Sequence, residues 1–137
     1  MNVRYLFFIL LVILFSSCNR NQNHVNRLDG KWNVTSTELV GYGKMDPDII
    51  YEFEECKLKK DDFCEVTVHN FDLDQVESGL FSITDSGQKM QLFSSNTLGS
   101  ILVEYDVEKF RLGKLVLTRD DASFGEYCRI EMKCIRN

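Results

Sequence analysis

The sequence has little proline, little histidine and no excess of basic residues, and each scarcity excludes a class of protein. The 137 residues include one Pro and two His, and the 16 Lys and Arg are outnumbered by 21 Asp and Glu. A single Pro and the lack of a long helical period argue against a disordered chain and against a helix bundle. The net charge of −5 disfavours nucleic acid as a partner, because phosphates need a basic face, and it permits a cationic partner. The length suffices for one domain with a core.

The side chains that carry catalysis or bind metals are also poorly placed. His24 lies in a polar stretch near the N-terminus and His69 at the end of an expected strand, so they form neither a metal-binding pair nor part of a Ser/His/Asp arrangement. Asp72, Asp74 and Glu77 lack the glycine and the ligand spacing of a calcium loop, which favours a solvated acidic loop. We therefore expect no enzyme, no cofactor and no metal.

The longest apolar run of the chain stands at its N-terminus. Arg4 supplies a positive charge, residues 6–15 are all apolar, and Ser16-Ser17-Cys18 follows. This order of charge, apolar core and small residues is typical of a secretory signal, and the run is short for a membrane span. We interpret residues 1–17 as a signal peptide, with an N-terminal apolar anchor as the alternative.

The end of this run resembles the cleavage site of bacterial lipoproteins, which has small residues directly before a cysteine. The resemblance implies that Cys18 becomes the lipidated first residue of the mature protein and contacts a membrane. It places the protein in the cell envelope, at the outer membrane, with the periplasmic and the surface-exposed side both open. Plain secretion is the alternative. Residues 18–27, which are polar and rich in Asn, are expected to form a flexible lipidated tether.

After the tether, short stretches of alternating apolar and polar residues follow one another. The first, 28–39, holds the single Trp and places Leu28, Trp32 and Val34 on one face. Each later stretch also has one apolar face, which predicts antiparallel strands around one core. The predicted strands are 28–39, 49–56, 63–69, 79–84, 89–93, 101–107, 114–118 and 127–135. Eight such strands close into a small barrel, so we expect an all-β, eight-stranded antiparallel up-and-down barrel over 28–137, present as a monomer.

The lengths of the connections carry a second signal. In an up-and-down meander successive connections alternate between the two ends of the barrel. The turns after the second, fourth and sixth predicted strands are short, whereas the other four connections are longer. The sequence therefore predicts a cup that is sealed by tight turns at one end and has four long loops around a mouth at the other.

The segment Gly30-Lys31-Trp32 on the first strand resembles the G-x-W motif of the lipocalin-like lipoproteins of Gram-negative bacteria. The resemblance implies a barrel in which Gly30 and Trp32 are structural and Trp32 packs across the closed end. It also implies that a basic side chain near the last strand lies over the Trp. The candidates for that side chain are Arg129, Lys133 and Arg136.

Two functions fit such a cup. The leading expectation is a binding protein for one small apolar or amphipathic ligand, lined by the inward-facing Tyr51, Phe53, Val66, Phe81, Met90, Tyr105 and Met132. A barrel of this size is also just wide enough to be filled by its own side chains, so a solid core is the competing expectation. The alternative function is a protein-binding or inhibitory module, similar to small tethered barrels that inhibit lysozyme, whose acidic rim would meet a cationic protein.

The cysteines predict a cross-link at the sealed end. Cys128 and Cys134 lie on one predicted strand about 20 Å apart, which is too far for a disulfide. Cys56, Cys64 and Cys134 are expected to cluster at the sealed end, with Cys128 apart as a buried thiol. The alternation places Cys56 and Cys64 on opposite faces, so a bond between them would need a bulge. A bond from Cys134 to one of them would instead tie the last strand to the sealed end. The remaining alternative is that all four cysteines are buried thiols and form no disulfide.

Overall fold

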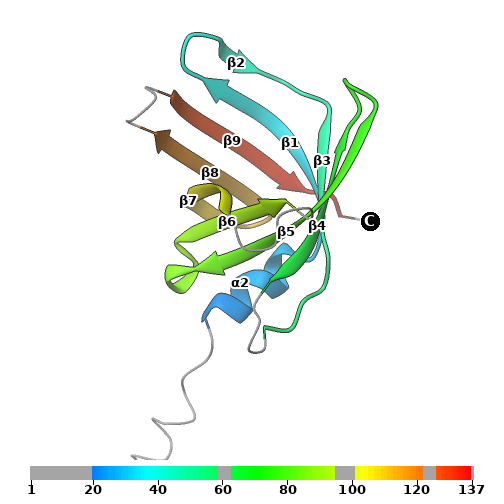
Figure 1. Ribbon diagram of the computed structural model, residues 1–137, viewed down its shortest axis with the longest axis vertical. Helices are drawn as coiled ribbons and strands as arrows, with labels where there is room; N and C mark the ends of the chain where they lie inside the picture. Colours follow the sequence, from blue (N-terminus) through cyan, green and yellow to red (C-terminus); the bar gives the residue numbers. More distant parts are fainter. Residues whose placement is uncertain (1–19, 59–62, 95–100, 122–125, 137) are drawn as a thin grey trace, which may run out of the picture.

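One short helix precedes a single antiparallel sheet that closes on itself (Figure 1). The computed structural model describes residues 20–58, 63–94, 101–121 and 126–136. The strands follow one another in the sheet in nearly the same order as in the chain, β2-β1-β3-β4-β5-β6-β7-β8-β9, and β1 also pairs with β9. The predicted eight-stranded up-and-down barrel is therefore confirmed, with β2 as a short extra strand beside β1.

The strand boundaries differ from the prediction mainly where strands project beyond the core. The elements are α2 (Arg20–Leu28), β1 (Gly30–Leu39), β2 (Gly43–Met45), β3 (Ile49–Phe53), β4 (Cys64–Asn70), β5 (Gln75–Thr84), η1 (Asp85–Gly87), β6 (Lys89–Ser94), β7 (Ile101–Arg111), β8 (Lys114–Asp121) and β9 (Glu126–Cys134). β5 begins four residues earlier than predicted, because Asn70 pairs with Gln75 across a tight turn. Residues 75–78 are all exposed, so no apolar alternation marked them as a strand.

β1 is the strand on which the barrel closes. One of its edges pairs with β3 through residues 30–33 and with β2 through residues 37–39. Its other edge pairs with β9, from Trp32 opposite Cys134 to Leu39 opposite Cys128. A register shift between Val34 and Ser36 interrupts this second ladder. Because both edges are paired, the first and last strands leave no open seam between them.

The core fills the part of the barrel nearest to α2. Its largest members are at most 1% exposed: Trp32, Phe53, Phe81, Met90, Leu115, Leu117 and Met132. The rings of Phe53 and Phe81 meet edge to face with 5.0 Å between their centroids. Burying one side chain of this kind contributes about 1.5–3 kcal/mol, so this layer is the main source of the barrel's stability.

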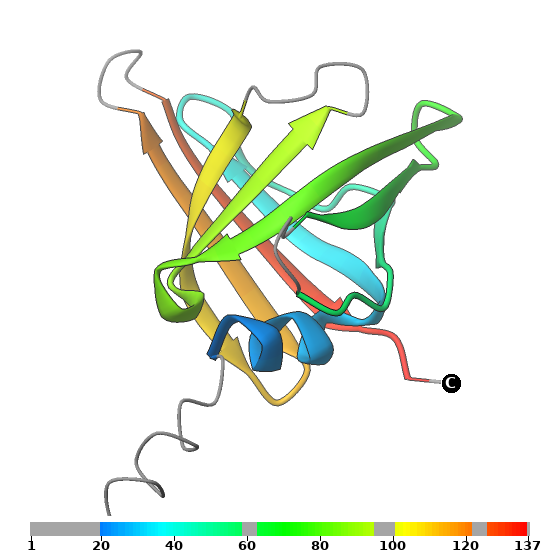
Figure 2. The same cartoon turned by 60° about the horizontal axis from the view of Figure 1, so that its bottom comes forward.

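Residues 20–28 form a helix, whereas the sequence predicted a flexible tether over 18–27 and the start of the first strand at Leu28. The helix α2 covers one end of the barrel (Figure 2). Its two buried residues, Val25 and Leu28, are three positions apart and so lie on the same face. The Trp32 indole N–H donates to the Leu28 carbonyl at 2.7 Å, and the Gln22 amide donates to the Cys56 carbonyl at 2.8 Å. Two apolar residues are too few to give a helical period, and packing on the barrel stabilises this helix instead.

One disulfide joins Cys56 to Cys64, whose Cα atoms are 5.6 Å apart. The bulge that the alternation demanded is unnecessary, because β3 ends at Phe53 and Cys56 lies beyond the strand. Cys134 is a free thiol, so the alternative bond from the last strand to one of these two cysteines does not form. Cys128 is also free, and it is half-buried rather than buried. β9 is continuous between these two cysteines, as predicted.

An ion-pair network covers the outer surface where β7, β8 and β9 meet. Glu131 accepts from the Lys114 ammonium at 2.7 Å and also pairs with Arg129, which in turn contacts Glu108 at 3.3 Å. The hydrogen bonds from Lys114 and then Arg129 lower the pKa of Glu131 to about 2. Val116 pairs with Glu131 in the ladder and is fully buried although its face points outward. The network therefore shields this valine from solvent.

Candidate functional site

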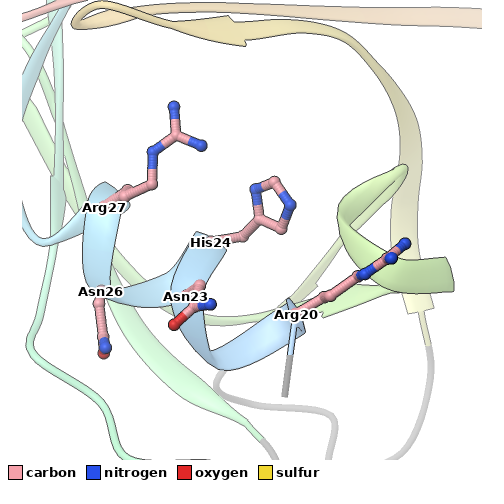
Figure 3. A pocket seen from close by; sticks show the side chains of 5 residues that line it. All are labelled: Arg20, Asn23, His24, Asn26 and Arg27. Carbon is pink, nitrogen blue, oxygen red and sulfur yellow. The ribbon is translucent and has the colours of Figure 1, made fainter. Parts of the chain in front are cut away.

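The end of the barrel that α2 covers, the closed end, is packed by aromatic and cationic side chains. The Phe110 ring lies 5.9 Å from the Trp32 ring and 5.6 Å from the His24 ring. The Arg27 guanidinium sits 4.2 Å from the centre of the Phe110 ring and donates to the Phe110 carbonyl at 2.8 Å. His24 and Arg27 project from the same side of α2, whereas Asn26 projects away from it (Figure 3). These contacts tie α2 to the β7–β8 turn.

The tight turns predicted at this end do not seal it by themselves. The connection from β3 to β4 spans residues 54–63 and is longer than predicted, while the β4–β5 connection at the opposite end is shorter. The helix α2 supplies the missing cover. The turns at 85–88 and 112–113 lie at this end as expected, so the assignment of the two ends is correct.

Trp32 occupies the place that the G-x-W resemblance implied. It is 1% exposed and pairs with Cys134 of the last strand. A further cation, which was not among the three candidates, lies at this end: Arg27 of α2 lies over Phe110, which in turn packs on the Trp. Arg129, one of the three candidates, lies on the outer surface in the Glu108–Glu131 network.

Inward-facing side chains become more exposed toward the end opposite α2, the mouth. Partners in an antiparallel ladder share a face, so the register identifies the inward positions. Along β3, Phe53 is 1% exposed, whereas Tyr51 and Ile49 are half-buried. Along β9, Met132 is 1% exposed and Cys128 is half-buried. The exposure of inward-facing side chains therefore increases from the packed core toward the mouth.

The seven predicted lining residues divide between these two zones. Tyr51 and Tyr105 are half-buried and face the interior near the mouth. The other five belong to the packed core: Phe53, Val66, Phe81, Met90 and Met132. The packed half agrees with the expectation of a solid core, and the half-buried residues near the mouth are where a ligand site stays a prediction.

The polar groups inside the mouth keep their protons at neutral pH. Burial raises the pKa of Tyr51 and of Tyr105, because a buried phenolate is poorly solvated. Negative charge on nearby groups would also oppose the ionisation of either phenol. Burial also raises the pKa of the Cys128 thiol, while the positive charge of Arg119 acts in the opposite direction. Tyr51 and Tyr105 are therefore hydrogen-bond donors, and Cys128 is a thiol rather than a thiolate.

Sequence reasoning missed two charged residues that face the same interior. Arg119 pairs with the inward-facing Cys128 in the β8–β9 ladder, and Glu77 pairs with the inward-facing Val68 in the β4–β5 ladder. Both were placed in loops, because the predicted strands ended at 118 and began at 79. Continuing the alternation of the core residues on β8 by two positions would have reached Arg119.

The rim, which we define as the turns and strand ends around the mouth, combines exposed apolar side chains with carboxylates. Phe71 and Leu73 on the β4–β5 turn are 56% and 62% exposed, and Tyr42 on the β1–β2 turn is 79% exposed. The Asp48 backbone N–H donates to the Asp72 carboxylate at 2.9 Å, which joins the β2–β3 connection to the β4–β5 turn. The exposed carboxylates of the rim are Glu38, Asp46, Asp48, Asp72, Asp74, Glu77 and Asp120.

No metal-binding group is present in the described part of the chain. Among residues 20–58, 63–94, 101–121 and 126–136, no three or more His, Cys, Asp or Glu side chains converge to hold an ion. None of the helices among the same residues has the length and apolar character needed to cross a membrane. Cys18 lies outside the described residues.

Comparison with protein-family models and with curated proteins found no match.

Proposed function

We propose that this chain is an envelope protein, held at a membrane by a lipidated Cys18, whose barrel binds one small apolar or amphipathic ligand at the mouth. The observation that carries the binding function is the half-buried, inward-facing set of apolar and aromatic residues above a packed core. Its described members are Ile49, Tyr51, Val68, Leu92, Val103, Tyr105 and Cys128.

The depth of the accessible interior limits the ligand. Because Phe53, Phe81 and Met132 fill the barrel below Tyr51, the ligand enters only the half nearest to the mouth. Its apolar part meets side chains such as Leu92 and Val103, and its polar part accepts hydrogen bonds from the tyrosine hydroxyls. A short-chain amphipath fits this depth better than a long chain that must thread a hollow barrel.

A variant that fills the mouth tests the binding site. Val103 is half-buried and inward-facing, so Val103→Phe should reduce binding of a fluorescent 12-carbon fatty acid at least tenfold in a titration. Val40→Phe on the exposed β1–β2 turn is the matched control and should bind as the wild type does. Equal affinity of the two variants would place the ligand elsewhere, and no binding by the wild type would remove the support for a cup.

The anchor is tested separately by Cys18→Ala. The lipoprotein-like segment before Cys18 and the start of α2 two residues after it support an anchor at the closed end, with the mouth directed away from the membrane. The variant should appear in the soluble fraction after membranes are washed with concentrated salt, which removes peripherally bound protein. Its retention in washed membranes would contradict lipid anchoring.

A second function, binding of a cationic protein, is favoured by the exposed Phe71, Leu73 and Tyr42 among the rim carboxylates. Replacing Asp46, Asp72 and Asp74 together by Asn should weaken binding of lysozyme, used as a basic probe, in calorimetry at low salt. Glu54→Gln combined with Glu55→Gln removes exposed charge at the opposite end and is the control. If both sets weaken binding equally, the attraction is a general charge effect.

A further inference from the structure

Charged side chains divide between the two ends of the barrel. The mouth has an acidic rim, whereas α2, the β7–β8 turn and the end of β9 present what we call the basic surface: Arg20, Arg27, Arg111, Lys114, Lys133 and Arg136. Strand pairing places Lys114 opposite both Arg111 and Lys133. A Cβ atom at Gly113 would lie 3.9 Å from the Arg136 guanidinium, and Arg27 donates to Phe110. These contacts join the three elements into one continuous surface at the closed end.

Two acidic residues of the closed end lie on another flank of α2, whereas the exposed Asp85 belongs to η1, the turn that packs against His24. Asp29 and Glu55 line a groove on that flank together with Lys57. The groove on the side of the basic surface is lined by Arg20, Asn23, His24, Asn26 and Arg27, which include no acid (Figure 3). Positive charge is therefore concentrated on the side of the closed end where α2 meets the β7–β8 turn.

Leu112 lies at the tip of the β7–β8 turn, and packing in the barrel does not explain why an apolar residue is there. It is 83% exposed, the largest value among the exposed large hydrophobic residues. Its φ of 53° lies in the left-handed region, which Gly, Asn and Asp adopt at lower cost than Leu. An apolar side chain held in solvent at a strained position, beside basic residues, is a pattern of surfaces that contact membranes.

Arg20, the first residue that the structure describes, also belongs to this surface. Arg20 begins α2 at the closed end, and the apolar run 6–15 and Cys18 come directly before it. Two residues span at most about 7 Å, so a lipid on Cys18 would lie near the basic surface rather than the mouth.

We propose that the basic surface docks on an anionic phospholipid membrane, with Arg111 and Arg136 at the headgroups and Leu112 inserted between them. This membrane contact is separate from ligand binding at the mouth. It depends on the proposed anchor only because a lipid on Cys18 would hold the basic surface close to the membrane. Residues 20–137 carry a net charge of −6, from 15 basic and 21 acidic residues, because Arg4 is the only charged residue before them. Attraction to an anionic membrane therefore requires a local basic surface, since the whole chain would be repelled.

The test uses the protein 20–137, which contains every described element and every described core residue but neither Cys18 nor the apolar run. It should cosediment with vesicles that contain 30% phosphatidylglycerol in phosphatidylcholine, and not with pure phosphatidylcholine vesicles. Binding should fall steeply as salt is raised from low to physiological ionic strength, since the charges are exposed.

Variants at the two ends separate this surface from general charge. Each exposed cation near an anionic membrane strengthens partitioning about fivefold, so Arg111→Gln with Arg136→Gln should weaken it about 25-fold. Leu112→Asn should weaken binding several-fold while raising the melting temperature, because Asn tolerates the left-handed backbone. The controls at the mouth, Lys44→Gln and Leu73→Asn, make the same kinds of change at exposed positions and should leave binding unchanged.

Three results would overturn the docking surface. They are equal binding to neutral vesicles, equal loss of binding in the mouth controls, and comparable affinity for duplex DNA at the same salt concentration. Failure of the anchor is a different result, because it appears as retention of the full-length Cys18→Ala variant in salt-washed membranes, with or without vesicle binding by residues 20–137. Failure of the mouth site appears only in the ligand titration.

Discussion

Replacing Trp32 by Ala removes the side chain that links the barrel core, the last strand and α2. Trp32 is 1% exposed, packs on the Phe110 ring, and donates its indole N–H to the Leu28 carbonyl at 2.7 Å. Truncating a buried aromatic residue costs about 3–5 kcal/mol, from lost burial and from the cavity that remains. Because small domains have a total stability of about 5–15 kcal/mol, the variant should unfold at much lower denaturant concentration or fail to fold.

Trp32→Phe separates packing from hydrogen bonding. Phe fills much of the same space but cannot donate, so the buried Leu28 carbonyl loses this partner at a cost of about 1–3 kcal/mol. The measurement is urea denaturation followed by far-UV circular dichroism, because Trp32 is the only Trp and fluorescence would be lost in both variants.

One control variant and two possible outcomes interpret the result. Tyr42→Ala removes a side chain that is 79% exposed and should change the stability by less than about 0.5 kcal/mol. A cost below about 1 kcal/mol for Trp32→Ala would refute the reasoning, since it would mean that the residue is not part of the packed closed end. An unchanged stability in Trp32→Phe would instead show that the bond to Leu28 contributes little.

Three further changes test the closed end and the outer surface. Gly87→Ala would place a Cβ 2.1 Å from the His24 ring at a φ of 89°, so it should displace α2 and expose its amides to hydrogen exchange while the strands stay protected. Replacing Cys56 and Cys64 together by Ala, which opens a loop with a sequence separation of 8, should lower the stability by about 2–3 kcal/mol in denaturant titrations. The pKa of Glu131 is depressed from 4.5 to about 2, so its contribution to stability is complete above pH 4.5 and is lost as the pH falls toward 2. Melting temperatures from pH 6 to pH 2 should therefore fall less steeply in Glu131→Gln than in the wild type, and parallel curves would contradict this assignment.

The sequence determined the fold because each core strand buries mainly one face, with exceptions such as Val116 on β8. Alternation on such strands gives their number, their antiparallel pairing and the burial of residues such as Trp32, Phe53 and Met132 without any knowledge of their partners. It failed at residues 75–78, which are exposed, because a strand that buries no face leaves no alternation. It also failed at Cys56, because the alternation was extended past Phe53, where the strand ends.

Only the tertiary structure decided which residues share the mouth and what closes the other end. Tyr51, Tyr105 and Arg119 come from β3, β7 and β8, and their common position depends on the register of ladders that close through β1 and β9. The helix α2 has two buried apolar residues, so its stability comes from the barrel end on which it packs rather than from its own sequence. A local pattern records which side of a strand is buried, but contacts between distant segments depend on how the whole sheet closes.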